Sequence, residues 1–251
     1  MFFFSGLDPM RQVPYLIIGD GRLARHFSYY FQALGLPFQQ WSRRQDPTTQ
    51  QLKKLAESSE RALLLISDNV IEAFIQQHNY LQKLLCIHCS GYLTIDAVVG
   101  AHPLMTFTPN LYRLNEYQQI PFVIEQSSHT FSDLFPGLPN PAYFIAKSQK
   151  ALYHSLCVLS GNFTCILWQK LFREFKQQFG FPATIALPYL ARICENVATD
   201  PEAALTGPLA RGDQKTLAAN LKALKGDPFQ AVYQAFVDCF ANTTTTPLNK
   251  T

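Results

Sequence analysis

Charged side chains are scarce in this sequence, at 16% of 251 residues, whereas a soluble domain carries about a quarter. The net charge of +3 is too small for the clustered basic surface of a nucleic-acid-binding protein. No unbroken apolar run approaches the roughly 20 residues of a membrane span, and no signal-peptide pattern follows Met1. We therefore expect no nucleic-acid partner, no membrane association and a cytoplasmic location.

Cysteine is also sparse, and the six cysteines lie in apolar runs rather than in a cysteine-dense framework. Cys86 and Cys89, with His88 between them, suggest a metal site. However, the pair begins inside a predicted strand, where alternate side chains point to opposite faces, and no second pair follows at zinc-binding spacing. The sequence therefore predicts reduced cysteines and no metal site.

Apolar residues are abundant, at 47% with 20 Phe and 11 Tyr, so the chain can bury a large core. Short apolar runs alternate with helical periodicity over residues 12–146, which predicts an α/β domain with a doubly wound, mostly parallel sheet. Residues 147–242 are typical of an all-α domain, and residues 243–251 of a frayed tail. The predicted strands are residues 15–18, 37–41, 62–66, 84–87, 122–124 and 143–145.

The first predicted strand ends in a glycine pattern, Gly19-x-Gly21-x-x-Ala24, directly before a helix. In this context the first glycine permits a tight turn, the second lets the backbone approach a pyrophosphate, and the small third residue allows close packing. The helix N-terminus, which begins with Arg22 and Leu23, favours phosphate charge. We predict a dinucleotide site here; the alternative is a glycine turn that binds nothing.

A basic corner follows the second predicted strand, at Ser42, Arg43 and Arg44. An NAD-binding site would place Asp or Glu there on the ribose hydroxyls, whereas arginine pairs with a 2′-phosphate. The chemistry favours NADP(H) over NAD(H), although a solvated basic turn would look the same.

Candidate substrate-site residues lie after two strands and along the first long helix. Ser90 follows the fourth predicted strand, and His102 lies in a predicted loop, held out of helix by the proline after it. Lys150 and His154 are four residues apart and share a helix face, with Asn162 about two turns further. A structural histidine or an ordinary solvated helix start would fit these residues equally well.

A Gly- and Pro-rich turn near residue 207 contains two more candidates, Thr206 and Arg211. These side chains either bind an anionic substrate group or simply belong to a connector between helices. Residues 147–251 carry eleven Lys or Arg against seven Asp or Glu, which favours an anionic substrate.

Taken together, these motifs are similar to one family of two-domain proteins, which join a Rossmann-like domain to a helical domain of unknown function called DUF2520. The most specific motifs are His102-Pro103-Leu104-x-Thr106-Phe107, Lys150-Ala151-Leu152-Tyr153-His154 and Leu205-Thr206-Gly207-Pro208-x-x-Arg211-Gly212-Asp213. The family resembles pyrroline-5-carboxylate reductases, ketopantoate reductases and β-hydroxyacid dehydrogenases. Where it tends to have Val-Pro-Asp against the cofactor, this chain has Ile66-Ser67-Asp68.

The resemblance implies an NADP(H)-dependent oxidoreductase that reduces a small carbonyl or imine compound in a cleft between the two domains. By similarity, Lys150 handles the proton, with His154 or His102 as rivals. Ser90, Asn162, Thr206 and Arg211 would position the substrate, and Ser67 and Asp68 would contact the cofactor. The alternative is a nucleotide-binding sensor without catalysis. Long apolar helical stretches such as residues 163–168 further predict a homodimer through the C-terminal helices.

Overall fold

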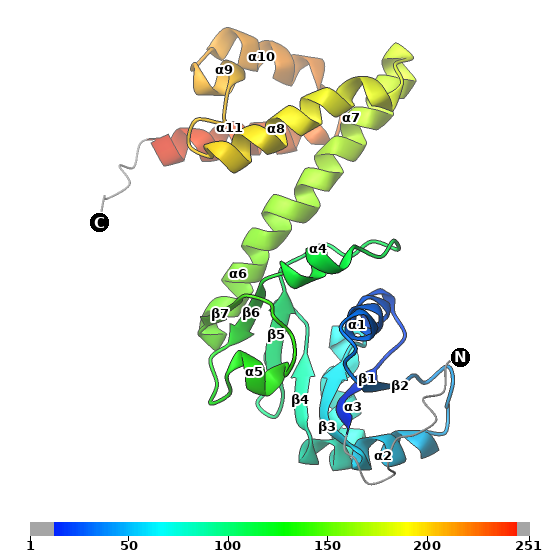
Figure 1. Ribbon diagram of the computed structural model, residues 1–251. Coiled ribbons are helices and arrows are strands. Elements are labelled where there is room, and N and C mark those ends of the chain that lie inside the picture. The colour runs from blue at the N-terminus through cyan, green and yellow to red at the C-terminus, as the bar shows by residue number, and fades with distance from the viewer. Residues whose placement is uncertain (1–12, 245–251) are drawn as a thin grey trace. The chain divides into compact units, whose positions relative to one another are not determined.

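A computed structural model of the chain describes residues 13–244. Its first part is a seven-stranded sheet with the strand order β2-β1-β3-β4-β5-β6-β7 (Figure 1). All neighbouring strands are parallel except β5 and β6. The prediction of a doubly wound, mostly parallel sheet followed by helices is confirmed. The strands are β1 (Val13–Ile18), β2 (Phe38–Trp41), β3 (Ser59–Leu64), β4 (Leu85–His88), β5 (Val99–Pro103), β6 (Phe122–Glu125) and β7 (Ala142–Ile145).

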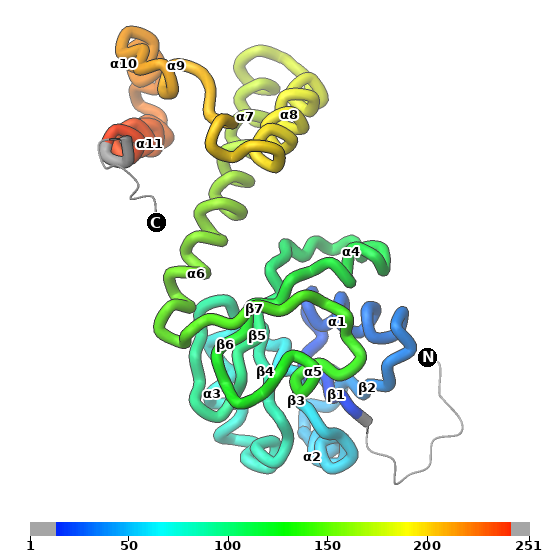
Figure 2. Tube along the Cα trace, turned by 60° about the vertical axis from the view of Figure 1, so that its left-hand side comes forward, coloured from blue at the N-terminus to red at the C-terminus, as the bar shows by residue number. Residues whose placement is uncertain are grey.

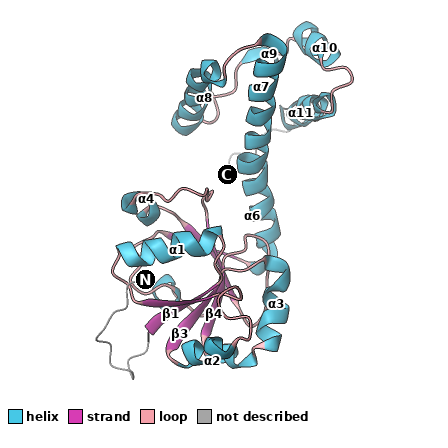
Figure 3. Cartoon of the chain, turned by 90° about the vertical axis from the view of Figure 1, so that its right-hand side faces the viewer, coloured by secondary structure: helices cyan, strands magenta, loops and turns pink. Residues whose placement is uncertain are grey.

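Helices cover both faces of the sheet (Figure 3). Alternate side chains of β1 point to opposite faces, so Tyr15 and Ile17 pack with one set of helices while Leu16 and Ile18 pack with the other. The first core lies under α1 (Arg22–Ala33), α4 (Leu114–Gln118) and α5 (Phe131–Leu134). The second core lies under α2 (Gln50–Glu57), α3 (Asp68–Gln77) and the 3₁₀ helix η1 (Asn79–Lys83).

Strand β5 is the main departure from the sequence prediction. Its sequence, Val-Gly-Ala-His-Pro, contains Gly100 and Pro103, both of which weaken a strand pattern. His102 was expected in a loop, but it lies on this strand opposite Val123 of β6, with which it pairs in antiparallel register. Strand β5 pairs with the last residues of β4, with Gly100 opposite His88, and then continues beyond them. His102 therefore lies near the end of β4.

A long helical segment follows β7 in the chain (Figure 2). A 3₁₀ turn, η2 (Lys147–Gln149), is followed without a break by α6 (Lys150–Cys157), a π-helical stretch η3 (Val158–Asn162) and α7 (Phe163–Phe179). The remaining helices are η4 (Ala183–Ala186), α8 (Leu187–Thr199), α9 (Gly207–Ala210), α10 (Gln214–Ala223) and α11 (Phe229–Thr244).

Two compact units divide within α7, between Ile166 and Leu167, whereas the sequence placed the domain boundary after residue 146. In the second unit, the rings of Trp168 on α7 and Tyr189 on α8 meet at 5.8 Å. Lys170 of α7 also forms an ion pair with Asp227, just before α11.

Within residues 13–244, the helix Lys147–Phe179 is long and apolar enough to cross a membrane by length and composition alone. A single helix of this kind is weak evidence of a membrane span. The predicted frayed tail is helical at residues 243 and 244, and its residues 245–251 lie outside the described part of the chain.

Candidate functional site

The first cleft lies at the carboxyl ends of β1, β2 and β3 and measures about 690 Å³. The chain leaves β1 for β2 on one side and returns to β3 on the other, so this edge is a topological switch point, where α/β sheets bind ligands. The cleft is lined by Gly19, Asp20, Gly21, Arg22, Leu23, Trp41, Ser42, Arg43, Arg44, Leu65, Ile66, Ser67, Val70 and Phe74. Most of the predicted nucleotide-site residues therefore line one cavity.

Gly19 is required by the fold at the floor of the first cleft. It has a φ of +132°, and a Cβ there would stand 2.3 Å from the carbonyl oxygen of Leu65. Gly21 is the N-cap of α1 and places no side chain on the first amides of that helix. The unpaired amides and the positive end of the helix dipole both lie at the N-terminus of α1, so this turn is suited to hold a phosphate.

The basic corner lies on the rim of the first cleft. Ser42 is 3% exposed, and its buried Oγ has no hydrogen-bond partner among the described residues. Arg43 is exposed, and Arg44 Nε lies 3.3 Å from a carboxylate oxygen of Asp20. This ion pair partly neutralises the acidic residue within the glycine turn. An unsatisfied hydroxyl beside two arginines fits a phosphate group.

Three further predicted residues of this region lie apart from the lining of the first cleft. Ala24 is buried under α1 in the sheet core, which fits its predicted packing role. Asp68 accepts a 2.5 Å hydrogen bond from Ser90 Oγ, so the predicted cofactor residue and the predicted substrate residue bind each other. This bond joins the start of α3 to the loop after β4.

The second cleft, of about 730 Å³, lies beside the end of β5 and the first turns of the long helix. It belongs entirely to the first unit. It is lined by His102, Leu104, Met105, Thr106, Phe107, Tyr153, His154, Leu156, Cys157, Ser160, Gly161 and Asn162. The structure therefore brings His102 together with His154 and Asn162, which the sequence placed on a different element.

Three rings form the polar corner of the second cleft. His102 Nδ1 and Tyr153 Oη are 2.7 Å apart, and the rings of His102 and His154 meet edge to face at 5.7 Å. Burial, with smaller contributions from His154 and Lys150, lowers the pKa of His102 to about 4. Burial also raises the pKa of Tyr153 above its usual value. Near neutral pH, an uncharged imidazole therefore faces an uncharged phenol.

Lys150 lies beneath this corner in a buried ion pair rather than in either cleft. Its Nζ is 2.6 Å from Glu125 Oε1 on β6 and also donates to the carbonyl oxygen of Leu93. Both residues are 1% exposed. Burial lowers the pKa of Lys150, and its hydrogen bond to Glu125 opposes that shift. A Cβ at Gly100 would stand 2.2 Å from Nζ, so the pair requires a glycine there.

Sequence reasoning missed Glu125, Gly100 and Tyr153. Glu125 had a visible signal, since a carboxylate ends an otherwise apolar strand segment. Tyr153 stands within the Lys150 to His154 motif, and the three-residue spacing from Lys150 also places it on the Lys150 face of the helix. Gly100 carried no signal beyond being a glycine.

His88, at the end of β4, has no exposed surface. Its Nδ1 accepts a hydrogen bond from the backbone N–H of Ser90 at 3.2 Å, so the ring proton of the neutral form is on Nε2, which has no partner among the described residues. Burial, followed by the charges of Lys150 and Lys147, lowers its pKa to about 3. In residues 13–244, no three His, Cys, Asp or Glu side chains are arranged to hold a metal ion.

The remaining predicted residues lie in the second unit. Thr206 is the N-cap of α9 and Arg211 its C-cap. Asp213, two residues on, caps α10 by accepting a hydrogen bond from the backbone N–H of Thr216. The turn thus connects two helices, and the predicted contact of Thr206 and Arg211 with substrate stays a prediction.

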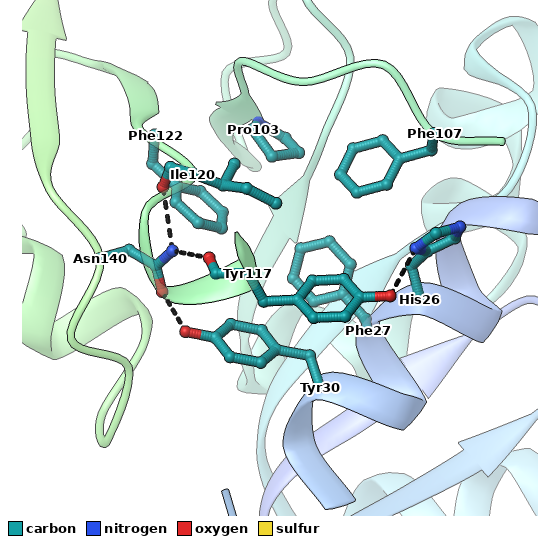
Figure 4. A pocket seen from close by; sticks show the side chains of 9 residues that line it. All are labelled: His26, Phe27, Tyr30, Pro103, Phe107, Tyr117, Ile120, Phe122 and Asn140. Carbon is teal, nitrogen blue, oxygen red and sulfur yellow. Dashed lines mark hydrogen bonds between the residues drawn. The ribbon is translucent and has the colours of Figure 1, made fainter. Parts of the chain in front are cut away.

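A third hollow, under α1, is a filled aromatic cluster rather than a binding site (Figure 4). Its free volume is about 10 Å³, which is room for one water at most. His26 Nε2 donates to the carbonyl oxygen of Thr108, so Nδ1 accepts the Tyr117 hydroxyl proton at 2.7 Å. Tyr30 donates to Asn140 at 2.7 Å. These bonds fix α1, and with it the glycine turn, against the segment around Thr108.

Comparison with known proteins gives one family and a set of similar folds. Residues 120–238 match the family described as "Domain of unknown function (DUF2520)". None of the curated proteins matches the sequence. The family match covers the end of the sheet and most of the helices that follow.

Three solved structures illustrate the similarity of fold. A proposed NADP oxidoreductase from Bacteroides fragilis is 20% identical, with a TM-score of 0.69 over 91% of this chain and 98% of its own. A protein from Thermotoga maritima is 20% identical, with a TM-score of 0.67 over 91% and 97%. A reductive aminase from Aspergillus terreus, in complex with NADPH and ethyl levulinate, is 14% identical, with a TM-score of 0.62 over 93% and 94%. At these identities the likeness establishes the fold.

Proposed function

For this Rossmann-like protein with a DUF2520 domain, we propose an NADP(H)-dependent oxidoreductase that reduces a small carbonyl or imine compound. The observation that carries the proposal is the first cleft, where a glycine turn at a helix N-terminus and an arginine corner line one cavity. Support also comes from the similar folds, one of which was solved with NADPH.

In this proposal the chain's own residues bind and orient the cofactor. The turn at Gly19 and Gly21 and the amides of α1 hold the pyrophosphate. Ser42, Arg43 and Arg44 hold the 2′-phosphate, which NADP(H) has and NAD(H) lacks. The bound cofactor supplies the hydride.

The substrate is proposed to occupy the second cleft, where His102, His154 and Asn162 offer hydrogen bonds among apolar side chains. His102 and His154 are the predicted proton-handling residues that line this cleft. Lys150, the third, is buried with Glu125, and its role in proton transfer stays a prediction. The sequence also predicts an anionic substrate. The residues that line the second cleft include no Lys or Arg, so this part of the proposal depends on Arg211 in the second unit.

The cofactor proposal is tested by titrating the protein with NADPH and NADH in a calorimeter. We expect tighter binding of NADPH, and in Arg43→Asp a loss of about 10- to 100-fold for NADPH with little change for NADH, because charge-assisted bonds to one phosphate are lost. The exposed Lys53 on α2 provides the matched control, Lys53→Asp. Equal effects of Arg43→Asp on both nucleotides, or no binding of either, would contradict the proposal.

Catalysis is tested by NADPH oxidation with ethyl levulinate, alone and with methylamine to form an imine. Turnover supports the reductase. NADPH binding without turnover on this and on a broader panel of keto acids and cyclic imines would favour the alternative, a sensor that binds the nucleotide without catalysis.

We also propose a homodimer in which a second copy covers the apolar seam Leu152, Leu156, Leu159, Phe163 and Ile166. These residues recur at alternating spacings of four and three and are 46–65% exposed, a pattern typical of helix pairing. We expect light scattering to give a dimer mass at micromolar concentration and Leu156→Lys to give a monomer, with the surface change Gln177→Lys as control. A monomeric wild-type protein would refute this assembly.

A further inference from the structure

Resting on the proposed reductase, we propose that Tyr153 is its proton donor and that His102 holds the Tyr153 hydroxyl toward the second cleft and returns its proton. Nothing in the sequence motifs singled out Tyr153. The proposal stands on the 2.7 Å contact between Tyr153 Oη and His102 Nδ1 and on the presence of both side chains in the lining of one cavity.

The buried ion pair accounts for the alignment of these two rings. Gly100 and His102 are two residues apart on β5, so they occupy the same face of the strand. Lys150 and Tyr153 are three apart on α6, so they share a face of that helix. Lys150 passes over Gly100 to reach Glu125 on β6, and Glu125 also accepts a hydrogen bond from the backbone N–H of Gly100 at 3.3 Å. The ion pair therefore ties α6 to β5 and β6 close to the contact between His102 and Tyr153. Lys150 is thus a positioning residue for this contact.

The alternatives for proton transfer fit the geometry less well. The Lys150 ammonium is sealed from both clefts and held by Glu125 and the Leu93 carbonyl. His154 Nδ1 is buried without a partner, against Gly91, where a Cβ would stand 2.1 Å from it. Tyr153 and His102 are half-buried like His154 and line the same cleft, but their polar atoms already lie in hydrogen-bond contact with each other.

The direction of the hydrogen bond decides whether this arrangement works. If Tyr153 donated to Nδ1, its single proton would be occupied. We assign instead the tautomer in which His102 Nδ1–H donates to Tyr153 Oη, so the phenolic O–H turns away from His102 toward the cleft, where a substrate oxygen or nitrogen would take it in place of the neighbouring Cys157 thiol. Burial keeps His102 uncharged near neutral pH, so the imidazole carries one proton and can relay another.

Reduction of a ketone consumes one hydride and one proton. A hydride from NADPH bonds to the carbonyl carbon while the C=O π pair moves to oxygen, and that oxygen takes the Tyr153 proton as the phenolic O–H bond breaks. The products are an alcohol, NADP⁺ and a phenolate. The phenolate then takes the Nδ1 proton of His102 as Nε2 accepts one from water, and exchange with solvent moves the ring proton from Nε2 back to Nδ1 before the next turnover. The net consumption is one hydride and one solvent proton.

The first test reads the tautomer without any turnover. Nitrogen-15 NMR of the histidine side chains at pH 7, with His102→Gln to assign the signal, is expected to show Nδ1 of His102 protonated. Tyr153→Phe is expected to shift that signal, whereas Tyr143→Phe, at an exposed tyrosine on β7, is expected to leave it in place. A proton found on Nε2 in both the free and the NADP⁺-bound protein overturns the assignment.

The second test is kinetic and uses NADPH with ethyl levulinate. We expect Tyr153→Phe to lower kcat by about 100-fold or more with KM changed less than about threefold, because a proton donor acts in the transition state. Tyr143→Phe is expected to be unchanged. The double variant Lys150→Met with Glu125→Leu is expected to keep kcat within about tenfold of wild type, since it replaces the buried pair by apolar groups.

The outcomes separate the two proposals. Wild-type turnover that survives in Tyr153→Phe refutes the proton donor alone. Loss of turnover in a folded double variant whose His102 Nδ1 signal is unchanged, so that the contact with Tyr153 is intact, returns that role to Lys150. NADPH binding with no oxidation by this probe or by the panel of keto acids and imines refutes the reductase and its proton donor together, whatever the tautomer of His102.

Discussion

The sheet and the helices that follow it bury their apolar side chains to very different extents. Residues of the sheet and of the helices that cover it, such as Leu16, Ile17 and Phe31, have no exposed surface. Between residues 147 and 241, the buried apolar residues are Ala186 and Leu217, while Leu152 is 65% exposed and Phe179 is 60% exposed. A sheet covered by helices on both faces completes its own core, whereas a few helices with apolar faces need a further surface.

The difference in burial also bears on where ligands can bind. Both clefts are lined by residues of the first unit, on elements fixed by the sheet core. Binding residues on a rigid scaffold keep their geometry without a ligand, which favours a preformed site. The helices offer mainly apolar surface, so their expected contribution is assembly with a second copy.

The largest expected contrast comes from matched truncations in the two regions. Phe31→Ala removes a fully buried ring from the sheet core and is expected to lower the free energy of unfolding by about 3–5 kcal/mol. Phe236→Ala, at a 55% exposed ring on α11, is expected to change it by less than about 0.5 kcal/mol. Urea unfolding of both variants at low protein concentration makes the comparison, and equal costs would show that the helices have a core of their own.

A smaller loss of stability is expected when one member of the buried ion pair is replaced, because the remaining Lys150 or Glu125 can change its protonation state and become uncharged. Lys150→Met is expected to destabilise the sheet by about 2–3 kcal/mol, and the double variant with Glu125→Leu to recover most of that loss. The surface pair Arg192 and Glu195, 2.7 Å apart on α8, is the control and is expected to contribute at most about 1 kcal/mol. Additive single changes at Lys150 and Glu125 in the urea experiment would rule out the coupling.

The smallest effect per residue is expected from mild acid, and only in the sheet region, since all six histidines precede residue 155. The pKa of His88 is lowered to about 3 and that of His102 to about 4, from an ordinary 6.5. The folded state therefore holds neutral rings that the unfolded state protonates, so stability is complete above pH 6.5 and falls as the pH drops toward 4. Between pH 6.5 and 5 we expect a loss of about 1–2 kcal/mol per histidine.

The two tryptophans allow this loss to be localised. Trp41 lies on β2 and Trp168 on α7, so Trp168→Phe leaves a reporter for the sheet and Trp41→Phe a reporter for the helices. Fluorescence-detected urea unfolding at pH 7 and pH 5 is expected to shift the sheet transition only. A shift of similar size at Trp168 would mean that the two regions unfold as one.

The sequence predicted the sheet architecture because buried parallel strands and amphipathic helices leave strong local patterns. It missed β5, since Gly100 and Pro103 disrupt such a pattern while the neighbouring strands still pair with it. For the first cleft, the motif Gly19-x-Gly21 and the corner at Arg43 are contiguous, and a strand, turn and helix place them together without help from distant residues.

The second cleft, in contrast, depends on contacts between residues that are far apart in the sequence. The hydrogen bond between His102 and Tyr153 joins residues 51 positions apart, and the ion pair between Glu125 and Lys150 joins residues 25 apart. No local pattern fixes such a pair, because its formation depends on how the strands order themselves in the sheet and on where the long helix starts. The sequence by itself therefore determined the sheet, the glycine turn and the chemistry available. Only the folded chain decided that Lys150 is buried with Glu125 while Tyr153 faces the cleft, since burial and distance arise from packing.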